Sequence, residues 1–144
     1  DVYKRQEQLI ASAGPQAASR IHLLGYKSGE DLQREVGNAR FTVLSSEWRE
    51  NMPYSGLESL AAQTPIIGAR IGGIPELVEE GKTGVTFESG NAVDLSNSML
   101  KCAAVSALNY SAMQHSCREY VNARCLQNEY ALALVDLYER VIQR

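Results

Sequence analysis

The chain has 144 residues, of which 44% are hydrophobic and 22% are charged, a composition typical of one globular domain long enough to bury a full core. Its formal net charge of -3 leaves no basic footprint, so composition argues against nucleic-acid binding. No apolar run approaches the ~18 residues that a membrane-spanning helix needs.

In the first part of the chain, helical and extended patterns alternate. A helix is expected over residues 2–13, ending at Gly14, and a short apolar strand over residues 21–24. Ser28 is a candidate N-cap, with Asp31 as a weaker capping-box partner, for a helix that runs to residue 36. The next strand is predicted over residues 41–44.

The middle of the chain continues the alternation. A loop over residues 45–54 leads to a helix over residues 55–62 and a strand over residues 65–68. Pro75 suits the first position of a short helix that extends to Glu79, and Gly81 is expected to close that helix in the left-handed conformation. The last strand is predicted over residues 84–87.

Everything after Ala92 is predicted to be helical, in segments that end near Leu108, begin at Ser111, and begin near Leu126. We expect one apolar face of the final helix to pack on this domain or to reach another domain. That face carries Tyr130, Leu134, Leu137, Tyr138 and Val141.

This order of elements predicts an α/β fold: a Rossmann-like, mostly parallel sheet with flanking helices, in a single domain over residues 1–144. Ligands of such sheets bind outside the carboxyl ends of the strands. The loops after Leu44 and after Gly68 lie at that edge, and they carry the least ordinary residues of the chain.

The cysteines are odd in number and lack CxxC spacing. Cys102, Cys117 and Cys125 all fall in helix-like sequence, which favours reduced packing residues over a disulfide or metal framework. We therefore expect a cytoplasmic protein without a metal site.

Two carboxylates, Glu50 and Glu58, lie eight positions apart. Pro53 and Gly56 between them do not suit a helix interior, so we place Glu50 in the loop and Glu58 in the first turn of the next helix. The N–H groups at that helix start would suit a phosphate. The alternatives are a solvated loop for Glu50 and, for Glu58, a capping box with Ser55.

Gly72 and Gly73 follow a strand and precede a helix at the same edge. They could form only a tight turn, or they could allow close approach of the backbone to a phosphate. They do not complete a GxGxxG dinucleotide fingerprint, and the sequence has no GxxxxGK[ST] phosphate loop.

Two stretches closely resemble the nucleotide-sugar half of family-four retaining glycosyltransferases, which have the GT-B fold. They are Ser-Ser-Glu-Trp-Arg-Glu-Asn-Met-Pro-Tyr-Ser-Gly-Leu-Glu at residues 45–58 and Pro-Ile-Ile-Gly-Ala-Arg-Ile-Gly-Gly-Ile-Pro-Glu-Leu-Val at residues 65–78. The resemblance is dense over residues 21–87 and loose in the helices at both ends. The Glu-x7-Glu spacing together with GGIPELV makes it highly specific.

The resemblance implies a function for each matched position. Glu50 would contact the hydroxyls of the transferred sugar and is the candidate catalytic residue, and Glu58 would hold the nucleotide ribose. The remaining donor-binding residues implied by the resemblance are Asn51, Met52, Pro53, Tyr54, Ser55, Gly72 and Gly73. Sugar transfer in this family retains the anomeric configuration and needs no metal or other cofactor.

The resemblance also implies partners: a nucleotide-sugar donor, and a glycan or lipid acceptor held by an N-terminal domain. The Arg and Lys that grip the diphosphate in relatives would lie before residue 1, so we expect this chain alone to bind a donor weakly and not to transfer sugar. The full-length enzyme would belong to polysaccharide biosynthesis and could associate peripherally with the inner face of a membrane.

Two positions depart from the family pattern. Met52-Pro53 replaces an aromatic residue and glycine, and Gln63 stands where a glycine usually ends the helix. A left-handed Gln63 would cost on the order of 1 kcal/mol. Two other functions remain open: a non-catalytic Rossmann-like binding module, and a nucleotide-sugar epimerase or phosphorylase on the same scaffold.

Overall fold

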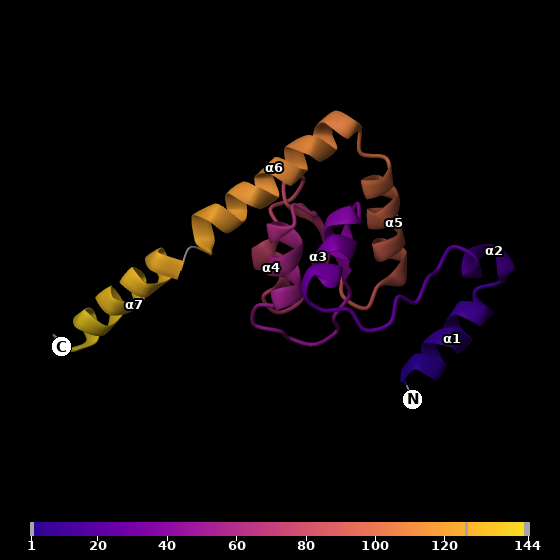
Figure 1. Cartoon of the computed structure of the whole chain (residues 1–144), viewed down its shortest axis with the longest axis horizontal. Coiled ribbons are helices and arrows are strands. Elements are labelled where there is room, and N and C mark those ends of the chain that lie inside the picture. Colours follow the sequence, from indigo (N-terminus) through magenta and orange to yellow (C-terminus); the bar gives the residue numbers. More distant parts are fainter. Residues whose placement is uncertain (1, 126, 143–144) are drawn as a thin grey trace.

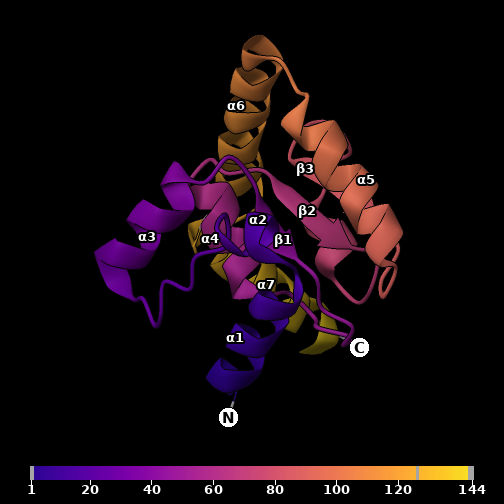
Figure 2. The same cartoon turned by 90° about the vertical axis from the view of Figure 1, so that its right-hand side faces the viewer.

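The computed structural model describes residues 2–125 and 127–142. A parallel three-stranded sheet lies at its centre, with strand order β1 (Thr42–Leu44), β2 (Ile66–Ala69) and β3 (Gly84–Phe87). In the register of the sheet, Ile66 pairs with Thr42 on one side and with Gly84 on the other. Helices cover both faces of this sheet, which confirms the predicted α/β fold (Figure 2).

The helices that flank the sheet follow the strands in alternation. They are α3 (Gly29–Asn38), α4 (Tyr54–Ala61), the short 3-10 helix η1 (Ile74–Leu77), α5 (Ala92–Ala103) and α6 (Ala107–Arg124). The first two helices, α1 (Val2–Ser12) and α2 (Pro15–Ala18), pack on each other. Together with α7 (Gln127–Ile142), they extend away from the sheet at opposite ends of the molecule (Figure 1).

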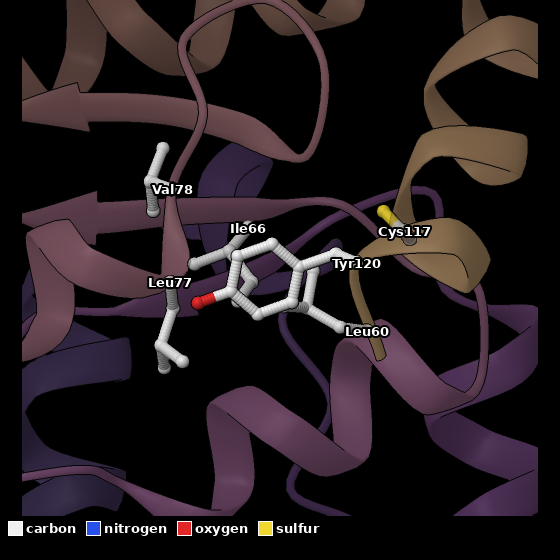
Figure 3. Close-up of a cluster of buried hydrophobic side chains, with 6 residues drawn as sticks. All are labelled: Leu60, Ile66, Leu77, Val78, Cys117 and Tyr120. Atoms are coloured by element: carbon white, nitrogen blue, oxygen red, sulfur yellow. The ribbon is translucent and has the colours of Figure 1, made fainter. Parts of the chain in front are cut away.

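The core has two parts because β2 is buried on both faces and its side chains alternate between them. On one face, Ile66 packs with residues of α4, η1 and α6 (Figure 3): Leu60, Leu77, Val78, Cys117 and Tyr120. On the other face, Ile67 and Ala69 pack with Phe87 and Cys102, the latter from α5. The loop that follows β2 is therefore attached to a strand that is buried on both faces.

The prediction of a strand over residues 21–24 is wrong. This segment has irregular structure, and Ile21, Leu23 and Leu24 are 45%, 48% and 55% exposed. An apolar run becomes a strand only where a neighbouring strand satisfies its backbone groups. The described sheet ends at β1, which pairs only with β2, so this segment contributes no strand to it.

Several predicted helix ends also need correction. The short helix after Gly73 is η1, which ends at Leu77 and not at Glu79. Gly81 has the expected positive φ of 75°, but it lies in the turn before β3, where its N–H donates to the Gly84 carbonyl oxygen. Ser28 occupies the N-cap position of α3 without a side-chain bond, and Asp31 pairs with Arg34 at 2.5 Å instead.

In the C-terminal half, the predicted break between residues 108 and 111 lies earlier in the structure. Helix α5 ends at Ala103, and Ser106 caps α6 by accepting a hydrogen bond from the Asn109 N–H at 3.2 Å. The predicted start of the last helix at Leu126 lies outside the described residues.

The apolar face of α7 does not pack on the sheet domain. Tyr130, Leu137, Tyr138 and Val141 are 70%, 50%, 59% and 61% exposed, and only Leu134 is half-buried. The expectation that this face packs against the domain is therefore wrong. That it reaches another domain stays a prediction.

Two of the three cysteines confirm the expectation of reduced packing residues. Cys102 and Cys117 are free and buried, one in each part of the core. Cys125 is free but exposed, because it follows the last turn of α6 as its C-cap and does not face the core.

Candidate functional site

The loops after β1 and β2 meet at the carboxyl edge of the sheet, as predicted. The N–H of Gly73 donates a hydrogen bond to the main-chain carbonyl oxygen of Glu50 at 2.7 Å. The N–H of Glu50 donates to the Trp48 carbonyl oxygen at 3.1 Å. The main chain of Glu50 is therefore fixed on both sides of its Cα atom.

Gly72 and Gly73 are required by this contact between loops. A Cβ atom on Gly73 would lie 1.6 Å from the Asn51 carbonyl oxygen, and one on Gly72 would lie 2.4 Å from that of Glu50. Gly72 also has a positive φ of 56°. The two glycines thus allow the loop over residues 49–51 to approach their backbone closely. The sequence did not reveal this role.

The Glu50 side chain is held as well. It is half-buried, and its Oε1 atom accepts a hydrogen bond from the Ser46 hydroxyl. The main-chain carbonyl oxygen of Ser46 accepts a hydrogen bond in turn from the Ser89 hydroxyl at 3.2 Å, from the loop after β3. Loops after all three strands therefore contribute to the position of one carboxylate.

Helix α4 begins one residue earlier than expected. Pro53 is its N-cap, and Ser55 is already its second residue, so the predicted capping box between Ser55 and Glu58 is wrong. Pro53 is extended, with a ψ of 117°, and Tyr54 is already helical, so the helix starts before Ser55. Pro53 has no side chain that can cap, so the N–H groups of Tyr54 and Ser55 are left for an outside acceptor.

The residues between the two glutamates differ in exposure. Pro53 is buried, whereas Asn51, Met52, Tyr54 and Ser55 are exposed. The loop is therefore anchored at its centre by the proline that begins α4. Its remaining side chains and the first N–H groups of the helix face solvent at the edge of the sheet.

Glu58 lies in the second turn of α4 and not in the first. It is exposed and lines a cavity of about 490 Å³ between α3 and α4, together with Gly29, Leu32, Gln33, Val36, Gly37, Ala61 and Ala62. The two glutamates have different surroundings: Glu58 lines this cavity, whereas Glu50 lies in the loop that Ser46 and Gly73 hold.

Sequence reasoning missed three residues near this site: Ser46, Ser89 and Arg70. Arg70 follows β2 directly, and its guanidinium donates hydrogen bonds to Thr86 Oγ1 and Asp94 Oδ2, each at 3.2 Å. These contacts join residues far apart in the sequence. No spacing rule could have found them, although the position of Arg70 at the end of a predicted strand was a signal.

No group of three or more His, Cys, Asp or Glu residues suited to a metal ion occurs among the residues that the structure describes. Within residues 2–125 and 127–142, no helix is both long and apolar enough to cross a membrane.

Known proteins resemble this chain in sequence and in structure. The family described as glycosyl transferases group 1 matches residues 2–104. An uncharacterised glycosyltransferase of Methanocaldococcus jannaschii is 30% identical over 100 residues, which are 69% of this chain and 27% of that protein. Trehalose phosphorylase of Grifola frondosa is 30% identical over 122 residues, which are 84% of this chain and 16% of that protein.

The crystal structure of HepE from Anabaena in complex with UDP-glucose superimposes with a TM-score of 0.77 at 20% identity, over 93% of this chain and 36% of that chain. This likeness supports the fold. The chain spans less than a third of the length of either curated relative. Because the family match covers most of the chain, the protein belongs to the glycosyl transferases group 1, with the fold of the C-terminal domain of GT-B glycosyltransferases.

Proposed function

We propose that this chain is the donor-binding domain of a retaining glycosyltransferase, which transfers a sugar from a nucleoside-diphosphate sugar to an acceptor. One observation carries the proposal. Ser46 holds the Glu50 carboxylate and Gly73 holds the Glu50 main chain, in the loop that leads to the start of α4, where no side chain caps the helix. A fixed carboxylate beside free N–H groups suits a sugar attached to a phosphate.

In this proposal the diphosphate of the donor binds at the start of α4. The N–H groups of Tyr54 and Ser55 would donate hydrogen bonds to the diphosphate oxygens, and the helix dipole adds a partial positive charge at the same end. Charge builds on the leaving phosphates during transfer, and donors that are already oriented stabilise it without reorganisation. We propose that the transfer needs no metal or other cofactor, as the family resemblance implies.

Glu50 would bind the transferred sugar, because an ionised carboxylate only accepts hydrogen bonds and so suits pairs of hydroxyls. Glu58 would hold the ribose from its cavity between α3 and α4. The two glutamates would thus bind the ribose and the transferred sugar, which flank the diphosphate at the start of the helix. The different surroundings of Glu50 and Glu58 support this division.

The relatives support the nature of the donor. HepE was crystallised with UDP-glucose, and its chain superimposes on 93% of this one. We propose that the donor here is likewise a nucleotide sugar, and that a further domain holds a glycan or lipid acceptor. We also propose that the anomeric configuration is retained, as the family resemblance implies.

A phosphorylase is the second candidate, favoured by the match of trehalose phosphorylase to 84% of this chain. Inorganic phosphate would then accept the sugar, and in the reverse reaction the sugar 1-phosphate would donate it. A protein that contains this domain distinguishes the two reactions by its products. The transferase releases a nucleoside diphosphate, whereas the phosphorylase forms a sugar 1-phosphate from phosphate without any nucleotide.

The donor-binding claim is tested by titrating the 144-residue chain with UDP-, GDP-, ADP- and dTDP-glucose, using amide NMR shifts and calorimetry. We expect one of these donors to bind and to shift the amides of residues 50–58. Glu50→Gln should weaken the binding of that donor about tenfold, the value of one charged hydrogen bond, and leave the binding of the free nucleoside diphosphate unchanged.

Glu7→Gln is the matched control, because Glu7 is an exposed carboxylate on α1, which makes no close packing with the sheet. This variant should bind the donor as the unmodified chain does. If none of the four donors shifts the amides of residues 50–58, the proposal is wrong for this chain. Equal donor affinity in Glu50→Gln and the unmodified chain would remove Glu50 from the sugar site.

A further inference from the structure

Ser46 makes two polar contacts, and the proposed function uses only the one to Glu50. Its hydroxyl donates to Glu50 Oε1, while its main-chain carbonyl oxygen accepts from the Ser89 hydroxyl at 3.2 Å. Ser46 lies two residues after β1 and is half-buried. Its hydroxyl and its main chain therefore have separate partners, one on the candidate sugar-binding residue and one on the loop after β3.

These contacts leave one half of the Glu50 carboxylate available. A carboxylate has two oxygens with about four lone-pair positions. Ser46 occupies Oε1, while Gly73 and Trp48 hold the Glu50 main chain through its carbonyl oxygen and its N–H. With its backbone and one oxygen held, the side chain has lost most of its freedom before any ligand arrives, and Oε2 remains for a ligand.

A carboxylate ordered before binding avoids the entropy cost of being ordered by the ligand. Because Ser89 donates to the Ser46 carbonyl oxygen, the main chain that carries the Ser46 hydroxyl is held to the loop after β3. The hydrogen bonds therefore connect the loop after β3 to Ser46, and Ser46 to the Glu50 carboxylate. Ser89 comes from the loop after β3, whereas Ser46 and Glu50 both lie in the loop after β1.

We propose that Ser46 is a positioning residue: its hydroxyl holds Glu50 Oε1 and thereby presents Oε2 to the hydroxyls of the transferred sugar. The inference rests on the proposed function. It predicts that the Ser46 hydroxyl affects the binding of the sugar part of the donor and not that of the nucleotide.

The test compares Ser46→Ala with Ser46→Thr in the 144-residue chain, titrated with UDP-glucose and with UDP. Ser46→Ala should weaken UDP-glucose binding about fivefold, the effect of one hydrogen bond, and leave UDP binding within about twofold. Ser46→Thr, which keeps the hydroxyl, should restore UDP-glucose affinity. Ser45→Ala, at the exposed neighbouring position, is the matched control and should bind both ligands normally.

A second measurement needs no ligand. Three-bond NMR couplings of the Glu50 side chain should report one rotamer in the unmodified chain and in Ser46→Thr, and averaging between rotamers in Ser46→Ala. The couplings report the position of the carboxylate. Amide spectra of the same samples report whether the substitution changes the fold as a whole, so the two effects are distinguished.

The proposal is overturned if Glu50 averages between rotamers in the unmodified chain, or if Ser46→Ala keeps a single rotamer and full UDP-glucose affinity. An equal loss of UDP and UDP-glucose binding would assign Ser46 a structural role and also overturn it. If the unmodified chain binds no nucleotide sugar, the proposed function fails, and the rotamer measurement still decides whether Ser46 holds Glu50.

Discussion

Replacing Gly73 by alanine tests the contact between the two loops directly. Gly73 has a φ of -87°, which any residue can adopt, so the backbone itself tolerates alanine. The added Cβ atom, however, would lie 1.6 Å from the Asn51 carbonyl oxygen and 2.7 Å from its carbonyl carbon. The whole effect of the substitution therefore comes from contact with the loop that carries Glu50.

The structure sets the size of this effect. Real Cβ contacts are essentially never shorter than 3.0 Å, so the Asn51 carbonyl must move by more than an ångström. Overpacking of this kind costs about 1–3 kcal/mol. Loss of the hydrogen bond from the Gly73 N–H to Glu50, which is 2.7 Å long, adds about 1 kcal/mol. A typical domain has 5–15 kcal/mol of stability, so the variant should still fold.

The assay is urea unfolding followed by circular dichroism, together with UDP-glucose titration of the folded variant. We expect Gly73→Ala to lose about 2–4 kcal/mol of unfolding free energy and most of its UDP-glucose affinity, because Glu50 moves with the loop. Gly37→Ala is the control for stability. Its Cβ atom would meet nothing within 4 Å in helix α3, so the variant should gain up to about 1 kcal/mol.

The reasoning is refuted if Gly73→Ala is as stable as the unmodified chain and binds UDP-glucose equally well. That result would mean that the loop over residues 49–51 can move without loss of unfolding free energy, and that its position does not affect how Glu50 binds the donor. Normal stability with lost UDP-glucose binding would instead show that the two loops are coupled only through the ligand.

The other predictions concern residues in and beside the core. Gln63 has a positive φ of 60°. Gln63→Gly should therefore raise the unfolding free energy by about 0.5–1 kcal/mol, whereas Gln114→Gly inside α6 should lower it by about 1 kcal/mol. Urea unfolding of both variants measures these changes, and a loss of stability in Gln63→Gly would contradict the prediction. Burial raises the pKa of Cys117 to about 12 from an ordinary value of 9.0. The unfolded chain then gives up a proton that the folded chain keeps, so stability should fall between pH 9 and 12, by at most about 1.4 kcal/mol per pH unit. Unfolding measured from pH 8 upward should show a shallower fall in Cys117→Ala, and an unchanged slope would contradict this account.

The sequence was sufficient for the order of helices and strands in the centre of the chain. Apolar runs bounded by turn residues located the strands that became β1, β2 and β3, because those signals are local and each strand has a partner. The resemblance pointed to Gln63 as a position where a glycine usually ends the helix, and its φ of 60° is left-handed. The run over residues 21–24 gave the same local signal, but no described strand pairs with it.

The capping box at Ser55 shows the limit of local rules. The S-x-x-E pattern is present, but the helix begins at Tyr54, and Pro53 occupies the cap. The conformation of Tyr54 decides between the two, because Tyr54 is already the first helical residue and follows a buried Pro53. A pattern of residue types contains no information on the packing that buries this proline.

The sequence by itself determined the α/β alternation, the edge at which ligands should bind, and the two glutamates of the family motif. Only the tertiary structure decided how Glu50 is held, because its contacts come from Ser46, Gly73 and, through Ser46, Ser89. It also decided that Glu58 lines a cavity between α3 and α4. The physical reason is the parallel sheet, which brings the ends of strands far apart in the sequence to one edge, where loops meet by close backbone approach.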